Sequence, residues 1–270
     1  MTNNKLLKRT IAIFLLTLIG CIIVPYEGSA QGFYVTADLG KNYSGGGHYL
    51  GFTLSNPNTV GVYGSYGEGT AWEMGVGYMF NDNIGIEGSF SRLTGIEFEH
   101  YNISFSQIDF SSGKISRITS ELKVCYGKKF NPYAKIGIVF GIKPELNILY
   151  DHTLYQNGST VVKSNEKYSG GSATGFSGTI GMEIKIYEHF EIYGEAKFIN
   201  QIWRPNEYVI LSETVTNGTT STFSTTFKLV DEIDNLTQTN QRLKPSFPFN
   251  SMGFFLGIKV NLWKSGTKGE

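Results

Sequence analysis

A hairpin pattern occurs three times in this chain and strongly limits the folds that it can adopt. The first copy, MGVGYMFNDNIGIEGSFSRL at Met74–Leu93, alternates apolar or small residues with other types on both sides of Asn81–Asn83. Similar patterns occupy Val124–Gly141 and Met182–Phe198. A period of two places successive side chains on opposite faces of a β-strand. The three copies therefore predict three antiparallel hairpins with tight turns.

The same alternation predicts eight strands, and helical periodicity is missing from residue 31 onward. The strands are Phe33–Tyr43, Thr70–Phe80, Ile84–Phe98, Ser116–Phe130, Tyr133–Leu149, Gly175–Tyr187, Phe190–Trp203 and Ser251–Trp263. Very short turns join three pairs of strands: Asn81–Asn83, Asn131-Pro132 and Glu188-His189. Long polar stretches join the others: Ser44–Gly69, Glu99–Ile115, Tyr150–Thr174 and Arg204–Asn250. Short turns at one end and long loops at the other are typical of an up-and-down antiparallel transmembrane β-barrel.

The strands of a soluble β-sandwich would also alternate apolar and polar residues. Two further features separate such a sandwich from a transmembrane barrel. The apolar face of each strand holds for a short distance from the tight turn and then ends at a charge, as at Arg92 and Lys41. About nine residues of tilted strand cover roughly the 25 Å apolar band of an outer-membrane barrel. Aromatic residues also gather beside the tight turns, which predicts an interfacial girdle. Its predicted members are Tyr78, Phe80, Phe130, Tyr133, Tyr187, Phe190 and Trp263.

The first 30 residues predict a secretory signal peptide. Lys5, Lys8 and Arg9 precede the apolar run Ile11–Val24, and small residues end at Ala30, where cleavage is expected. A retained anchor is the alternative, although the run is short for a membrane-spanning helix. The predicted division is a signal at 1–30, a barrel at 31–263 and a short tail at 264–270. The stretch that ends in Cys21 also resembles a lipoprotein cleavage box, which leaves lipidation of Cys21 open.

Four segments of the mature chain resemble one family of bacterial membrane proteins. They are GFYVTADLG at Gly32–Gly40, GVGYMFNDNIGIEGSFS at Gly75–Ser91, FNPYAKIGIVFG at Phe130–Gly141 and GFFLGIKVNLW at Gly253–Trp263. These segments resemble the strands of the outer-membrane protein beta-barrel domain family, which is OmpA-like and common in Bacteroidetes. The resemblance implies a bacterial outer-membrane location, contact with outer-membrane lipid and insertion by the barrel assembly machinery. The tail Lys264–Glu270 departs from the family, whose barrels often end on the aromatic residue.

The face opposite the apolar one carries a predicted network of lumen charges. Its acids are Asp38, Glu73, Glu87, Glu121, Glu183, Glu191 and Glu195, and its bases are Arg117, Lys123, Lys135, Lys143, Lys185, Lys197 and Lys259. An eight-stranded barrel is only wide enough for its own side chains. We therefore expect these charges to pair and to plug the lumen. A small pore or transporter for small solutes is the alternative that a charged lumen allows.

Composition and histidine placement argue against several other functions. Removal of the signal takes away three of 23 basic and one of 23 acidic residues, so the mature chain has a formal net charge of −2. No basic patch indicates nucleic acid. His100 with Glu99 and Ser104 is the strongest candidate for a catalytic set, which would suit a lipid A-modifying enzyme. Proximity in sequence is weak evidence for a triad, so we expect no catalytic residues, cofactor or metal.

The long stretches hold the remaining functional information. Asn157-Gly158 and Asn217-Gly218 predict hairpin tips, and Tyr208–Val215 and Thr222–Leu229 predict strands beside the second tip. These two strands either extend the wall above the membrane or cross the membrane and give ten strands. Their threonine and serine content favours the first alternative. Loops on a rigid scaffold commonly bind ligands. The predicted function is therefore a structural or surface-interaction barrel with an extracellular protein or surface ligand as its possible partner.

Overall fold

The computed structural model describes residues 32–55, 58–102, 107–127, 129–155, 159–216, 219–232 and 240–262. Every regular element in these ranges is a β-strand. None of the ranges holds a helix with the length and apolar character needed to span a membrane. The predicted signal peptide, Cys21, Trp263 and the tail lie outside the described residues, as do Ser104 and both predicted hairpin-tip dipeptides.

Eight strands form a closed antiparallel barrel, as the alternation predicts. In order around the ring they are β1 (Gly32–Ser44), β4 (Gly69–Met79), β5 (Ile84–Asn102), β6 (Gln107–Cys125), β7 (Phe130–Tyr155), β9 (Ser172–Lys185), β10 (Phe190–Arg204) and β15 (Ser251–Asn261). Closure occurs between β1 and β15, whose register runs from Tyr34↔Asn261 to Ser44↔Ser251. The eight-strand prediction is confirmed, and the ten-strand alternative is wrong.

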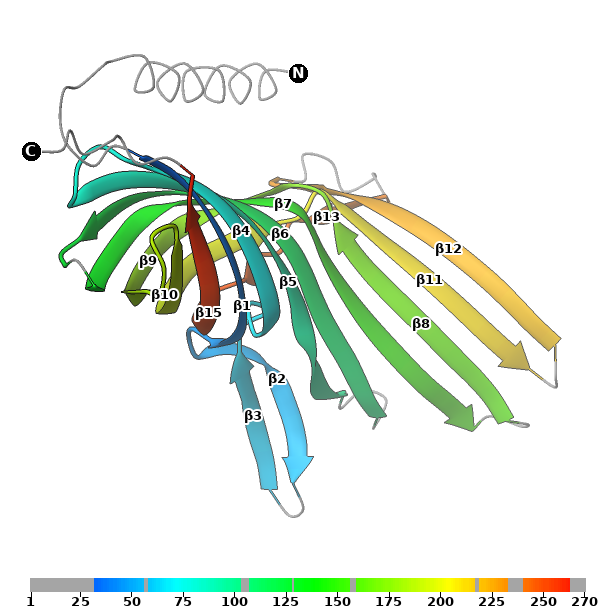
Figure 1. Cartoon of the computed structure of the whole chain (residues 1–270). Helices are drawn as coiled ribbons and strands as arrows, with labels where there is room; N and C mark the ends of the chain where they lie inside the picture. Colours follow the sequence, from blue (N-terminus) through cyan, green and yellow to red (C-terminus); the bar gives the residue numbers. More distant parts are fainter. Residues whose placement is uncertain are drawn as a thin grey trace, which may run out of the picture.

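Three further strands leave the barrel at its long-loop end as an open sheet (Figure 1). They are β8 (Ser159–Ser169), β11 (Glu207–Thr216) and β12 (Thr219–Val230). The first half of β7 pairs with β9 and its second half pairs with β8. The change of partner occurs at Gly170-Gly171, where φ angles of 70° and 77° favour glycine. The term open sheet is used below for β8, β11, β12 and the second half of β7.

Shorter strands fill the remaining connections at the long-loop end. The hairpin of β2 (His48–Ser55) and β3 (Asn58–Gly64) lies beside β5. The strand β13 (Gln241–Leu243) pairs in parallel with the end of β12, and β14 (Phe247–Pro248) pairs with the end of β10. Strands therefore occupy much of the four stretches that the sequence predicts as polar loops.

One predicted turn is in the wrong place. The sequence places a turn at Asn131-Pro132, but β6 ends at Cys125 and β7 already begins at Phe130. The Tyr126 backbone N–H donates to the Pro132 carbonyl at 3.0 Å, so Pro132 continues the ladder through its oxygen. Proline has no N–H to contribute and is tolerated near the start of a strand. Its presence therefore marked the beginning of the strand and not the turn.

The outer wall is apolar and exposed over most of its height. Leu256 is 76% exposed and Phe176 is 70% exposed, while the opposite face of the same strands is buried and largely polar. A protein dissolved in water rarely exposes so continuous an apolar surface. This arrangement of apolar residues outside and polar residues inside is the one that a barrel adopts in lipid.

The girdle at the tight-turn end contains most of the predicted aromatic residues. Phe130 and Tyr187 are exposed, Phe190 is half-buried on the outer wall, and the ring of Tyr78 packs at an angle against the rings of Phe33 and Phe80. Tyr133 was wrongly placed in this girdle, because its side chain is only 6% exposed and lies in the lumen. Tyr133 is two residues from Lys135, so strand parity gives both the same inward direction.

Candidate functional site

The lumen near the tight turns is filled by a chain of ion pairs. Glu183 is held from two sides, by Lys123 and by Lys259, whose Nζ lies 3.0 Å from Glu183 Oε2. The same Lys259 Nζ lies 3.0 Å from Glu191 Oε2. Asn131 also donates to Glu183 at 3.0 Å. Each buried charge at this level therefore has an oppositely charged partner, as burial requires.

A second set of ion pairs occupies the middle of the lumen. Lys135 Nζ lies 2.9 Å from Glu87 Oε1 and 2.9 Å from Glu195 Oε2. Lys197 Nζ lies 2.5 Å from Glu73 Oε1 and 3.3 Å from Glu195 Oε1. All five side chains are buried. Glu195 thus joins the two lysines into one network that crosses the barrel from β4 and β5 to β10.

Three tyrosine hydroxyls complete this network, and the sequence prediction did not include them. Tyr34 donates to Glu87 at 2.9 Å, Tyr133 to Glu195 at 2.7 Å and Tyr193 to Asp38 at 2.6 Å. Each tyrosine faces a glycine on the neighbouring strand in the register, namely Gly77, Gly181 and Gly257. The missing side chain of the glycine leaves the space that the ring occupies.

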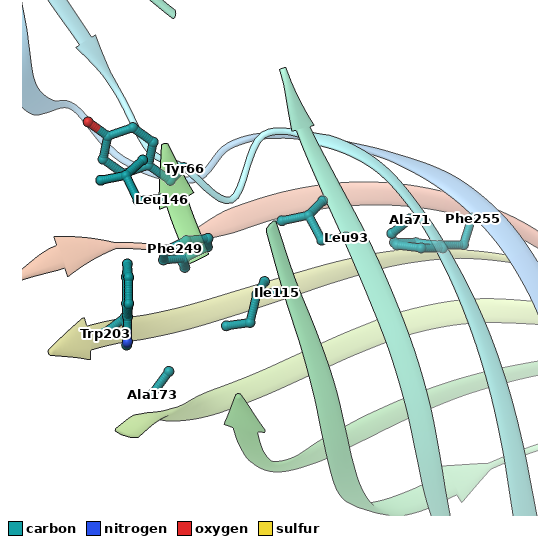
Figure 2. Close-up of a cluster of buried hydrophobic side chains, with 9 residues drawn as sticks. All are labelled: Tyr66, Ala71, Leu93, Ile115, Leu146, Ala173, Trp203, Phe249 and Phe255. Atoms are coloured by element: carbon teal, nitrogen blue, oxygen red, sulfur yellow. The ribbon is translucent and has the colours of Figure 1, made fainter. Parts of the chain in front are cut away.

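A cluster of buried apolar side chains lies at the long-loop end of the barrel (Figure 2). Seven of its members come from barrel strands and two, Tyr66 and Phe249, come from the segments that cross the barrel mouth. The remaining members are Ala71, Leu93, Ile115, Leu146, Ala173, Trp203 and Phe255. Trp203 and Phe249 are fully buried, and their rings lie 5.9 Å apart. The term apolar cap is used below for these nine residues.

Arg117 joins the apolar cap to the charged lumen beneath it. Its Nε donates to Gln201 Oε1 at 2.9 Å, and its Nη2 donates to the Phe249 carbonyl at 3.1 Å. The Phe249 N–H in turn donates to the Gln201 carbonyl at 2.8 Å. These hydrogen bonds hold the crossing segment against the inner wall, so the cap is fastened by buried polar contacts as well as by packing.

The predicted network and the observed one differ at two lysines. Lys143 is exposed on the outer wall and was wrongly assigned to the lumen, because β7 carries an extra residue at this point. Lys185 is half-buried and forms no ion pair with another described residue. The other twelve predicted residues lie on the inward face, with seven acids and five bases. Glu121 accepts hydrogen bonds from Ser177 at 2.6 Å and Thr179 at 3.4 Å.

One group of carboxylates in the described part of the chain is close enough to resemble a metal site. Oxygens of Asp38, Glu73 and Glu195 lie within 4.8 Å of one another. Lys197 already contacts two of these carboxylates, and Tyr193 donates to the third. The ammonium group therefore supplies the positive charge that a cation would otherwise bring.

The open sheet carries a groove and an aromatic row. The groove has a volume of about 630 Å³ and is bordered by apolar side chains that include Phe110, Leu149, Leu211 and Phe223. On the face that continues the lumen wall, Tyr168 and Tyr208 stack at 4.5 Å, and Phe227 follows at 5.6 Å. These features place a ligand-sized apolar hollow on the part of the chain that stands outside the barrel.

Glu166 lies among the tyrosines of the open sheet. It accepts a hydrogen bond from Tyr150 at 3.2 Å. Burial, followed by the negative charge of Glu166, raises the pKa of Tyr168 to about 12. The same two causes raise the pKa of Tyr150. Both hydroxyls therefore remain protonated over the whole physiological range of pH, and that of Tyr150 remains a donor toward Glu166.

The described histidines do not form a catalytic set. His48 Nε2 lies 3.1 Å from Asn250 Nδ2 at the long-loop end, and His189 Nδ1 lies 3.1 Å from the Asn261 carbonyl at the tight-turn end. They occupy opposite ends of the barrel. The side chains of His100 and His152 lie outside the part of the structure that describes side chains, so the proposed set around His100 remains a prediction.

Comparison with known proteins identifies the family. A family model described as outer membrane protein beta-barrel domain matches residues 12–230. The chain belongs to this family. The protein is therefore a β-barrel of the bacterial outer membrane. The open sheet stands at the end of the barrel where the long connections lie, and the tight turns lie at the opposite end.

Several solved outer-membrane proteins are similar to this barrel at low sequence identity. Neisserial surface protein A is 11% identical, with a TM-score of 0.41 over 87% of this chain and 100% of that one. A major outer membrane protein from Thermus thermophilus is 9% identical, with a TM-score of 0.45 over 86% and 100%. OprG from Pseudomonas aeruginosa is 12% identical, with a TM-score of 0.42 over 89% and 100%. None of the curated proteins compared with the sequence matches it.

Proposed function

We propose that this outer-membrane barrel is a non-conducting surface-interaction protein whose extracellular open sheet presents the binding surface. The observation that carries this proposal is the succession of three buried layers of side chains inside the barrel. Ion pairs around Glu183, ion pairs around Lys135 and the apolar cap follow one another along the barrel axis. A barrel of eight strands leaves no room for a solute beside such a filling.

The energy of the ion pairs argues against a gated pore through the lumen. A hydrated ion that passed Lys135 would have to separate it from Glu87 and Glu195, which both lie at 2.9 Å. Separation of a buried pair leaves uncompensated charges, and this is strongly unfavourable at about 3–5 kcal/mol for one lost partner. The passage would then continue between the buried apolar side chains of the cap, where an ion would lose its hydration.

The open sheet supports the binding role. Phe223 is 67% exposed and Leu211 is half exposed, although both stand outside the apolar band of the barrel. The free edge of β12 carries the uncharged stretch Thr219–Phe227, without proline. Native edge strands usually carry charges or proline that prevent pairing with another chain. An unprotected edge beside an apolar groove suits recognition of an extended polypeptide.

Electrical recording tests the closed lumen. We expect the purified mature protein to produce no steady conductance in planar bilayers. A reproducible single-channel conductance in the wild type would reject the non-conducting barrel in favour of a small pore or transporter. Trp203→Ala removes the largest side chain of the apolar cap, and we expect it to remain silent because the ion pairs beneath the cap are intact.

Cysteine labelling in intact cells tests the surface role of the open sheet. The buried Cys125 provides an internal control, since its Sγ donates to the Asp82 carbonyl at 3.3 Å inside the barrel. We expect a membrane-impermeant maleimide to label Phe223→Cys and to leave the parent protein unlabelled. Label on the parent, or none on Phe223→Cys in folded protein, would contradict this arrangement. A ligand that binds the groove should protect the new cysteine.

The absence of catalysis belongs to the same proposal. His48 and His189 lie at opposite ends of the barrel and each contacts an asparagine. Mass spectra of lipid A should be identical in cells with and without the protein. A mass change that disappears in His100→Ala would establish a lipid A-modifying enzyme instead.

A further inference from the structure

Three basic side chains lie together on the outer wall where the apolar band ends. Arg92 on β5, Lys114 on β6 and Lys143 on β7 are all exposed. Arg92 pairs across the strands with Ser116, which pairs with Ile142, the residue before Lys143. Neighbouring strands are about 4.8 Å apart, so the three cations share a small surface. The term basic patch is used below for these three residues.

The geometry of Arg92 brings its charge over the middle strand of the basic patch. Its Nη1 donates to Ser116 Oγ at 3.3 Å, and Ser116 is buried although it faces outward. The guanidinium therefore lies on the outer face of β6, the strand that also carries Lys114. The fork of N–H donors of an arginine matches the oxygens of a phosphate group.

A β-bulge brings Lys143 into the basic patch. Between the pairs Lys114↔Glu145 and Ser116↔Ile142, β6 has one residue and β7 has two, Lys143 and Pro144. Lys143 has a φ of 47°, the only positive φ of a non-glycine residue in the described ranges. Without this extra residue the period of two would direct the lysine into the lumen. A strained backbone of this kind tends to persist at functional positions.

The basic patch has an excess of positive charge. None of its three side chains forms an ion pair with another residue that the structure describes. Two outward carboxylates lie near the patch: Glu145 is the direct cross-strand partner of Lys114, and Glu97 lies opposite Ser112 in the next outward row. Glu145 is already paired with Lys167 at 3.3 Å. The patch is therefore available to an anion at the level where the apolar band meets the lipid headgroups.

A hollow in the lipid-facing wall adjoins the basic patch. It lies on β1, β4 and β15, has a volume of about 520 Å³, and includes Leu39, Trp72, Met74, Leu256 and Ile258 in its lining. Trp72 is the direct cross-strand neighbour of Arg92. An apolar hollow in the wall of the barrel, with the cation Arg92 on the next strand, matches a molecule that has both acyl chains and phosphate.

We propose that the basic patch and the adjoining hollow bind one phosphorylated glycolipid of the outer leaflet. Arg92, Lys114 and Lys143 bind its phosphate, and the hollow on β1, β4 and β15 takes an acyl chain. The outer leaflet is the source because both features face lipid at the extracellular end of the band. This site is separate from the lumen and from the groove of the open sheet.

Lipid titration of the intact mature protein in detergent micelles tests the proposal, with native mass spectrometry as the readout. The probes are bisphosphorylated lipid A and the same lipid after phosphatase treatment. We expect the phosphorylated form to bind about tenfold more tightly or better, as expected for several cations near an anionic lipid. The triple variant Arg92→Gln, Lys114→Gln, Lys143→Gln should lose this preference. Equal binding of both lipids to the wild type would overturn the proposal.

Matched variants distinguish binding at this site from general electrostatic attraction between the lipid and the protein. Lys129 is an exposed cation between β6 and β7 at the tight-turn end of the barrel, and Lys129→Gln should keep the preference. Loss in Lys129→Gln as large as in the triple variant would overturn a local site. Ala37→Phe fills the hollow and should weaken the binding of both lipids to the same extent. Unchanged binding would overturn the part of the proposal that places an acyl chain in the hollow.

Two further controls keep the result interpretable. Heat-modifiable migration reports whether each variant forms the barrel, and Arg92→Gln alone replaces the triple variant if that one does not fold. Inorganic phosphate in large excess should leave the lipid preference unchanged. If free phosphate abolishes it, the patch binds free anions and the glycolipid proposal is wrong.

Discussion

The ring of Tyr34 occupies the space that a side chain at Gly77 would need, since a Cβ on Gly77 would lie 2.0 Å from Tyr34 Cζ. In the same way, a Cβ on Gly181 would lie 2.4 Å from Tyr133 Cζ, and a Cβ on Gly257 would lie 2.5 Å from Tyr193 Cζ. Each ring then delivers its hydroxyl to a buried carboxylate. The lumen is therefore organised by pairs of tyrosine and glycine as much as by its charges.

Substitution of Gly77 tests this organisation. Gly77→Ala would force Tyr34 away from Glu87, and we expect a loss of about 1–3 kcal/mol in the free energy of unfolding, as for other overpacked sites. Urea titration in lipid vesicles measures it. Gly88→Ala is the matched control on the next strand, because no atom lies within 4 Å of its added Cβ. Equal stability of the two variants would contradict the tyrosine and glycine pairing.

Removal of Lys135 tests the ion pairs of the lumen. Lys135→Met leaves Glu87 and Glu195 without the ammonium that lies 2.9 Å from each. We expect destabilisation of about 3–5 kcal/mol, which is typical when one partner of a buried pair is lost. Lys185→Met supplies the comparison, because Lys185 is half-buried and has no ion pair with a described residue. The prediction fails if both variants unfold at the same urea concentration.

The bulge at Lys143 predicts an unusual tolerance to glycine. A left-handed backbone strains a lysine by about 1–2 kcal/mol, and glycine removes that strain while it adds disorder to the unfolded chain. Lys143→Gly should therefore leave stability unchanged or raise it by up to about 1 kcal/mol. Lys114→Gly, in regular strand, should lower stability by roughly 0.5–1 kcal/mol. A larger loss at position 143 than at 114 would show that the bulge conformation is wrong.

The tyrosines of the open sheet should titrate late in alkaline solution. The pKa of Tyr168 is raised to about 12 by burial and then by Glu166. A phenol with a raised pKa in the folded state stabilises that state below its ordinary value near 10. This contribution falls as pH rises from about 10 towards 12, because the unfolded chain loses the proton first. Tyrosinate absorbance near 295 nm follows the titration in folded protein.

Replacement of Glu166 separates its charge from the effect of burial. Glu166→Gln should lower the pKa of Tyr168 and Tyr150, because the carboxylate is the second cause of the increase in both. Glu213→Gln alters a carboxylate on the same sheet that does not contribute to either increase, and the absorbance curve should remain as in the wild type. Identical curves for Glu166→Gln and the parent would rule out this electrostatic coupling.

The alternation of residues was sufficient to predict the closed barrel, because lipid and lumen impose opposite requirements on successive residues. Twelve lumen charges followed from the same parity. The parity rule should also have placed Tyr133 inside, since Lys135 two residues later was assigned to the lumen. Its closeness to the turn and its aromatic character outweighed parity in the prediction, and that choice was wrong.

Lys143 and the apolar cap could not be predicted in this way. A single extra residue reverses the faces of a strand, and the signal for the bulge is only a lysine before Pro144. Tyr66 and Phe249 belong to stretches without alternation, so their burial depends on the tertiary path of the segments over the barrel mouth. The strands of the open sheet are rich in threonine and serine on both faces, which hides their pairing partners.

At Gly170-Gly171 the strand that pairs with β7 changes from β9 to β8. The closed ring and the open sheet therefore tolerate insertions differently. Around a closed ring, strand number, tilt and stagger must agree, so an insertion in β9 or β10 requires compensation in other strands. An insertion in β8, β11 or β12 alters only an open margin of the sheet. We therefore expect the exterior of this protein to diversify in length and sequence while the ring that anchors it remains constant.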